Sequence, residues 1–478
     1  MIELNLKGYT SSIKLSDSVI QRFKKPIIFY MVNKNDVRPF FITFVIINFM
    51  KSEILYLFSY NQENIEIINA QPNNKKFSFD KNPHCALCIN EGEDFLAFMD
   101  NEEFFVYINY KTMIMKVYTM NDIVKNTDIK YKRISSTFYK DDSDKNFFYM
   151  SAVDSSNLLH IFRVSLTLDN IEEIDTFPSN PFPPHVLRKH KDFLLLSHEF
   201  KYSKFELQKN GKIVSQDELA RIFLKHTLQL LYSQQRESTS LQQDNIKLSK
   251  KNAKELFKII KENYNIRCLP GSILALNLNT KEKVYYNTMG GSPAHFEIDL
   301  KDDVIYTSSH NFLSSDTLGG LVYIEPAVID KFKMNGSKLE LVGTFSNPKG
   351  FRYTTHKIFY YNNKPYICVF GQPNRLMFID ATTMELMFYE DISEDELTNQ
   401  SDLSIYLNTR DNEFDLAAIE VSEDGECIIF VGPDYIYFYN FPQKKLIKKI
   451  DYKLFSIPND NISLSDYKIR TAHMNYLD

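Results

Sequence analysis

Residues 291–312, GSPAHFEIDLKDDVIYTSSHNF, contain the pattern that decides the fold. They read Pro, His, an apolar strand, an acidic turn, a second apolar strand, and then Ser-His-Asn-Phe. Residues 181–200, PFPPHVLRKHKDFLLLSHEF, repeat the same order. Short runs of Val, Ile, Leu, Phe and Tyr that close at Asp, Asn or Lys are typical of antiparallel strands joined by tight turns. The two segments therefore predict a strand hairpin that recurs along the chain.

Weaker copies of this hairpin extend the repeat in both directions. Residues 82–100 keep the Pro-His start and the acidic turn, 354–371 keep the His, and 414–431 have Asp415 in its place. A third strand of a common type follows in 271–284, 319–332 and 374–387, and a fourth returns to the next hairpin. Four strands that recur every ~45–60 residues are the blade of a β-propeller.

The fold class expected is therefore all-β, a single β-propeller domain over residues 1–478 with about seven four-stranded blades; six or eight blades stay open. The expected blades lie near 25–70, 84–120, 130–175, 185–290, 295–345, 356–390 and 414–450. The tail 462–478 is expected to close the ring by pairing with the first blade or with the strand at 2–7, which leaves no free sheet edge there.

The repeat resembles that of the YVTN and selenium-binding propeller group, whose blades open with Pro-His or Pro-Arg before the innermost strand. The resemblance covers about half of the chain and only at the level of the repeat. It implies the propeller fold and no particular function.

One segment interrupts the strand pattern. Residues 201–270 predict a helical insertion within one blade, with helices near 215–234 and 249–263. Ser215 followed by Glu218 has the spacing of a capping box, and apolar residues then recur at helical spacing. The insertion falls between the second and third strands of its blade.

The histidines are the candidate functional residues. His84, His185, His295 and His356 each stand just before an innermost strand, and His198 and His310 each end a second strand. Because these two positions return to the same mouth of the central channel, the six imidazoles are expected to converge there. Imidazole binds Fe, Cu and Zn well, so the pattern predicts a mononuclear transition-metal site. Glu199 and Glu297 would bind that metal or orient its ligands.

A structural interpretation of the same histidines stays open beside this one. A His that recurs at one blade position can hydrogen-bond the backbone of the neighbouring blade. The blade near 130–175 lacks such a His, which favours this interpretation. Two functions remain: a metal-dependent oxidoreductase or lyase acting on a small molecule, or a noncatalytic scaffold that binds a protein or small ligand through rim loops and the helical insertion.

Composition narrows the remaining classes. The chain has 478 residues, 44% of them hydrophobic and 14% aromatic, and a net charge of −5, which gives no indication of nucleic-acid binding. No Gly-rich phosphate loop is present, so no nucleotide cofactor is expected. The longest apolar run, 40–50, is too short to span a bilayer. Five cysteines and an N-terminus without a continuous apolar core indicate a cytosolic protein without a disulfide framework.

Overall fold

The computed structural model describes most strands and their turns. The residues described are 2–12, 22–33, 43–59, 67–70, 83–89, 94–99, 104–124, 128–135, 139–141, 143–178, 184–197, 205–215, 218, 221–222, 225, 262–315, 320–323, 325–336, 338–347, 353–371, 375–392, 406–409, 418–432, 435–451, 467–469 and 475–476.

Four antiparallel sheets have the strand order of propeller blades, and each is named here by its innermost strand. The β15 blade consists of β15 (Leu187–His190), β16 (Phe193–Ser197), β20 (Ser272–Asn277) and β21 (Lys283–Asn287), and the β22 blade of β22 (Ser292–Asp299), β23 (Val304–His310), β26 (Val328–Asn335) and β27 (Lys338–Ser346). The β28 blade consists of β28 (Tyr353–Tyr361), β29 (Lys364–Gly371), β30 (Arg375–Asp380) and β31 (Glu385–Asp391). The β33 blade consists of β33 (Ala418–Val421), β34 (Cys427–Val431), β35 (Tyr435–Asn440) and β36 (Lys445–Asp451).

A fifth blade divides its innermost position between two short strands. It consists of β10 (Tyr131–Ile134), β11 (Lys140–Asp141), β12 (Asp144–Asp154), β13 (Leu158–Ser165) and β14 (Ile171–Pro178). The turns between strands use residues that tolerate a left-handed backbone, as at Asn362 and Asn363, with φ of 49° and 60°. Such turns match the twist of the strands that they join.

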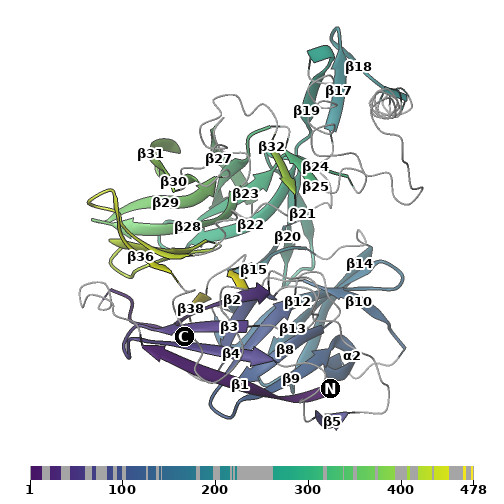
Figure 1. The fold of residues 1–478 in the computed structure, drawn as a ribbon. Helices are drawn as coiled ribbons and strands as arrows, with labels where there is room; N and C mark the ends of the chain where they lie inside the picture. Colours follow the sequence, from purple (N-terminus) through teal and green to yellow (C-terminus); the bar gives the residue numbers. More distant parts are fainter. Residues whose placement is uncertain are drawn as a thin grey trace, which may run out of the picture.

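Eleven further strands form one sheet that contains two more four-stranded units. One unit consists of β6 (Pro83–Ile89), β7 (Asp94–Met99), β8 (Phe104–Asn109) and β9 (Ile114–Thr119). The other consists of β1 (Ile2–Ser12), β2 (Ile27–Asn33), β3 (Thr43–Asn48) and β4 (Glu53–Ser59). Three short strands pair at its edges: β5 (Ile67–Ala70) with β1, and β37 (Tyr467–Ile469) and β38 (Asn475–Tyr476) with β2. β1 joins the two units because it pairs with both β4 and β9. Five separate sheets and these two units are thus arranged as blades (Figure 1).

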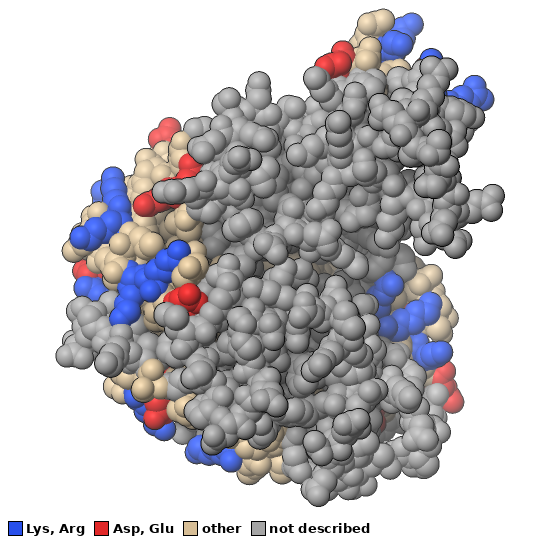
Figure 2. All heavy atoms as spheres, viewed as in Figure 1, with Lys and Arg blue, Asp and Glu red and all other residues tan. Residues whose placement is uncertain are grey.

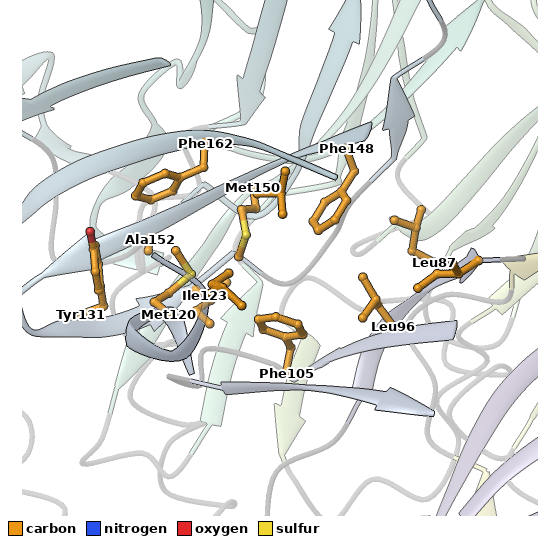
Figure 3. Close-up of a cluster of buried hydrophobic side chains, with 13 residues drawn as sticks. Leu87, Leu96, Phe105, Met120, Ile123, Tyr131, Phe148, Met150, Ala152 and Phe162 are labelled. Carbon is orange, nitrogen blue, oxygen red and sulfur yellow. The ribbon is translucent and has the colours of Figure 1, made fainter. Parts of the chain in front are cut away.

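Apolar side chains pack each blade against the next. Between the β6 and β10 blades, Phe105 and Leu96 face Phe148 and Met150, and the short helix α2 (Met120–Val124) adds Ile123 to the same cluster (Figure 3). Equivalent clusters join each later pair of blades along the chain. The alternation of apolar side chains along every strand therefore fills the seams between blades, which form the core.

The last blade also contacts the first. The ring of Phe438 in β35 lies 6.4 Å from the rings of both Phe23 and Phe49, and Arg22 Nη1 lies 2.8 Å from Asp424 Oδ2. The C-terminal strands β37 and β38 pair with β2 of the first blade. The expectation that the C-terminal tail pairs with the first blade is confirmed. The chain is an all-β protein with the β-propeller fold.

Two small accessory sheets, together called the crown, stand on one face of the blades. One consists of β17 (Phe205–Lys209), β18 (Lys212–Ile213) and β19 (Asn265–Cys268), inserted between β16 and β20. The other consists of β24 (Phe312–Ser315), β25 (Gly320–Tyr323) and β32 (Tyr406–Thr409). Hairpin β17–β18 projects furthest from the body, with β24, β25 and β32 nearer its base (Figure 1).

The insertion therefore carries strands that the sequence pattern did not indicate. Ser215 Oγ accepts the backbone N–H of Glu218 at 3.2 Å, as the capping box requires, and the described residues 218, 221, 222 and 225 are helical. Most of 215–234 and of 249–263 lies outside the described residues. Within the described part of the chain, no helix is long and apolar enough to cross a membrane.

Candidate functional site

The innermost strands of four consecutive blades place alternating charges on the channel axis. Arg188 Nη1 of β15 lies 3.5 Å from a Glu297 carboxylate oxygen of β22. Lys357 Nζ of β28 lies 3.7 Å from the same carboxylate and 2.8 Å from that of Glu420 in β33. The Arg188 guanidinium also lies 4.5 Å from the centre of the Tyr139 ring, beside β11. We call these five residues the axial ion chain.

The axial ion chain is largely shielded from solvent, with Lys357 the most exposed of its charges at 22%, and its formal charges cancel. The side chains of Arg188 and Glu297 are 15% and 13% exposed, and that of Glu420 is 7% exposed. Two cations alternate with two anions, so each charge has an opposite neighbour from another blade. Buried charges in proteins are kept only when they are paired, because removal from water is costly.

The electrostatics of Lys357 follow from this arrangement. Burial by itself would lower the pKa of its ammonium group, but the carboxylates of Glu420 and Glu297 outweigh burial and raise that pKa above its ordinary value. Lys357 therefore remains a cation, and it connects the β22, β28 and β33 blades.

Two of the sequence-predicted histidines meet near the mouth of the channel. The rings of His185, just before β15, and His295, in β22, lie edge to face with centroids 4.7 Å apart. His185 is half-buried, and His295 is buried. Both precede the members of the axial ion chain on their strands, so the imidazole pair lies on the mouth side of that chain.

His356 is oriented differently from this pair. Its Nε2 lies 3.3 Å from the carbonyl oxygen of Tyr306, which belongs to the preceding blade, and the ring is 1% exposed. Burial lowers the pKa of His356 to about 4, so the imidazole is neutral and Nε2 donates to the carbonyl. This is the contact that the structural interpretation describes, with a ring that lies in the seam between blades and not on the axis.

The other predicted ligands are placed only in part. His310 is buried at the end of β23, opposite Ser292. His84 lies in β6, but its side chain is outside the described residues, as are His198 and Glu199. Glu297 has Arg188 and Lys357 as its ionic partners. Among the described residues, no group of three His, Cys, Asp or Glu side chains has the geometry to hold a metal ion.

Two histidines away from the mouth are each paired with carboxylates. His160 Nδ1 lies 2.8 Å from Glu173, and its Nε2 lies 3.3 Å from Asp154. His190 Nε2 lies 2.6 Å from Asp303 of the next blade. Both rings are buried, so these contacts fix strands and blades to each other.

A hollow of about 470 Å³ lies between the β10 and β15 blades at the opposite end of the channel. Its lining includes Ser143, Lys189, Lys191 and Asp192. Both lysines already have partners, since Lys189 Nζ lies 2.8 Å from Asp141 and Lys191 is paired with Asp303. The two lysines that line the hollow are therefore already neutralised by carboxylates of described residues.

Arg188, Lys357 and Glu420 were not singled out by the sequence pattern. A signal was present for Arg188 and Lys357, because each follows a repeat histidine within three positions, in HVLR and HK, as Glu297 does in HFE. Glu420 follows no repeat histidine. From blade to blade these charges alternate as Arg, Glu, Lys and Glu. Only the ring arrangement shows that neighbours in this series touch.

Comparison with known proteins identifies no family for this chain. No protein family and no curated protein matches this sequence. The chain is similar in structure to the WD40 β-propeller domain of Doa1, with 8% identity, a TM-score of 0.42, and coverage of 79% of this chain and 84% of that one.

Two further solved structures are similar at the same level. A putative 6-phosphogluconolactonase from Bacteroides fragilis has 10% identity, a TM-score of 0.43, and coverage of 97% of this chain and 100% of its own. Dihydro-heme d1 dehydrogenase NirN, in complex with DHE, has 9% identity, a TM-score of 0.43, and coverage of 98% and 77%. Membership of the YVTN or selenium-binding group is not shown.

Proposed function

We propose that this protein is a noncatalytic propeller scaffold that binds a protein partner through its crown. The observation that carries the proposal is the crown itself, in which chain segments inserted into separate blades join on one face of the propeller. The described charges on the axis neutralise one another and join blades, whereas the crown adds structure that the blades do not need. Binding residues are commonly placed on such additions to a rigid scaffold.

Contacts within the crown support a single binding surface. The backbone N–H of Cys268, at the end of β19, donates to Glu325 Oε2 at 3.2 Å, which ties the first accessory sheet to the segment after β25. β25 pairs in turn with β32, which lies in the connection between the β28 and β33 blades. The connections β16–β20, β23–β26 and β31–β33 therefore meet in the crown, and a partner bound there would contact all three.

Site-specific cross-linking tests this proposal. A photo-reactive amino acid is placed singly at Arg267 in the crown, at Leu300 in the turn between β22 and β23, and at Leu446 on the outer strand β36; all three side chains are exposed. We expect one polypeptide to be cross-linked from Arg267 and not from the other two. That polypeptide, once purified, should bind the full chain. Equal capture from all three positions, or capture only from Leu300, overturns the proposal.

A second proposal is a mononuclear transition metal, Fe, Cu or Zn, near the mouth, serving an oxidoreductase or lyase reaction on a small molecule. What supports it is the His185–His295 contact near the mouth. Its ligand set would have to include His84 or His198.

Metal analysis of protein purified without a His tag decides this second proposal. Near-stoichiometric metal that is lost in a folded His295→Ala, His310→Ala double variant supports it. A metal-free protein, or a metal content that the double variant leaves unchanged, excludes it.

We also propose that the protein acts in the cytosol. The described cysteines Cys268, Cys368 and Cys427 are all buried free thiols, which is usual in reducing compartments. Fractionation of cells that express the full chain tests this, and recovery in a membrane-enclosed oxidising compartment would contradict it.

A further inference from the structure

The end of hairpin β17–β18, residues 209–213, is called the tip, and its backbone is rigidly defined. Asn210 and Gly211 form a two-residue turn with φ of 52° and 75°. Turns of this kind match strand twist, and Asn-Gly is their preferred sequence. The N–H of Val214 donates to the carbonyl of Leu207 at 2.8 Å, and β19 pairs with β17 on its other edge. The tip is therefore a preformed element that projects from the crown.

Two lysines face each other across this turn. Lys209 and Lys212 are directly opposite in the strand register, and both are exposed. Side chains at such positions have Cβ atoms about 5 Å apart, and like charges there are destabilising. Neither ammonium group forms an ion pair with a described residue; Lys209 Nζ lies 5.3 Å from the centre of the Tyr264 ring. Figure 2 shows Lys and Arg side chains gathered on this projecting part of the molecule.

The other face of the tip carries an exposed apolar side chain. Ile213 is opposite Gln208 and is 66% exposed. Because side chains alternate along a strand, Ile213 points away from the lysine pair. An apolar residue beside charged ones is the usual composition of a protein-binding contact, with an apolar anchor and a polar rim.

These features favour a protein over a membrane surface. Each Lys near an anionic bilayer contributes about 1 kcal/mol, and stable anchoring requires a longer apolar group or more basic residues. One Ile and two Lys do not reach that level. A partner with a carboxylate pair and an apolar contact site would engage both faces of the tip at once.

We infer that the tip binds an acidic segment of the protein partner, whose Asp or Glu carboxylates lie between the ammonium groups of Lys209 and Lys212. This inference rests on the proposed scaffold function and names the chemistry of its partner. Binding relieves the repulsion between the lysines, so the free-energy gain includes removal of a cost that the free protein carries.

Selection from a phage-displayed library of random peptides, with the full chain as bait, tests the inference. We expect enrichment of peptides that combine several Asp or Glu residues with an apolar residue. A synthetic copy of an enriched peptide should bind the Lys209→Gln, Lys212→Gln variant about five- to tenfold more weakly, as expected for two lost exposed ion pairs. The binding should also weaken as salt concentration rises.

A matched control separates the lysine pair from net charge. Lys338→Gln with Lys445→Gln removes the same two charges from exposed positions in the outer strands β27 and β36, and binding should stay within about twofold of wild type. Equal binding by the tip variant, failure to enrich acidic peptides, or binding that depends on the lysines only with vesicles of phosphatidylserine and phosphatidylcholine would overturn the inference. Crown cross-linking of undiminished yield in the tip variant, at a partner concentration below that giving half-maximal yield, would remove the inference and leave the scaffold function standing.

Discussion

The axis and the tip place charges in opposite ways. On the axis, Lys357 lies between the carboxylates of Glu297 and Glu420, and each charge has a neighbour of opposite sign. At the tip, Lys209 lies opposite Lys212, and neither forms an ion pair with a described residue. The axial charges are buried and hold blades together, whereas the tip charges are exposed and oppose the hairpin that carries them.

This difference separates residues that serve the fold from residues available to a partner. A paired buried charge is already committed, because its removal leaves another charge unpaired in a low-dielectric site. An exposed like-charge pair has no such structural use and remains open to an anionic ligand. Three measurements test this difference between paired and unpaired charges.

The largest effect is expected at the axis. Lys357→Met removes the cation and leaves the buried Glu420 carboxylate without its ion-pair partner, whereas Glu297 keeps Arg188, so the free energy of unfolding should fall by about 3–5 kcal/mol. The loss should lessen as pH falls, because burial raises the pKa of Glu420 and the folded state therefore takes up a proton there before the unfolded state does. Urea denaturation at several pH values measures both.

A charge-balanced control accompanies this variant. The double change Lys357→Met, Glu420→Gln removes one charge of each sign, keeps the Arg188–Glu297 pair, and should recover much of the lost stability. A Lys357→Met protein as stable as wild type at neutral pH would show that the axial ion chain does not join the blades.

A smaller, pH-dependent effect is expected at His356. Its pKa is about 4 when folded and 6.5 in the reference state, so the unfolded chain binds a proton first as pH falls from 6.5 to 4. The wild type should lose up to about 3 kcal/mol of stability from this residue over that range. His356→Gln keeps a donor for the Tyr306 carbonyl but cannot be protonated, so its stability should fall less steeply. Parallel stability curves for the two proteins would contradict the buried neutral imidazole.

The smallest effect is expected at the tip and has the opposite sign. Lys209→Gln with Lys212→Gln removes the repulsion across the turn and should raise local stability by a few tenths of a kcal/mol. Hydrogen exchange of the Val214 amide, which bonds Leu207, reports this change in the hairpin. Faster exchange in the variant would show that the lysines stabilise the free hairpin, and the comparison with the axis would fail.

The sequence repeat predicted the blades because strand hairpins are determined by residues close together in the chain. The expected spans 84–120 and 295–345 agree with β6–β9 and β22–β27 within a few residues. The pattern was wrong for 319–332, which it assigned to one third strand. Residues 320–323 belong to the crown and 328–335 to the blade, because pairing with β32 removes the first part from the sheet.

The sequence by itself determined the propeller, the order of its blades and the positions at which histidines recur. Alternating apolar residues and turn residues act over a few positions, so they can be read from the chain. Only the tertiary structure decided which side chains meet. The His356 ring lies in the seam between two blades, and the ring of His185 lies against that of His295. Four charged side chains from separate blades form one series of ion pairs along the axis. Such contacts depend on the twist and closure of the whole ring, which no local pattern specifies.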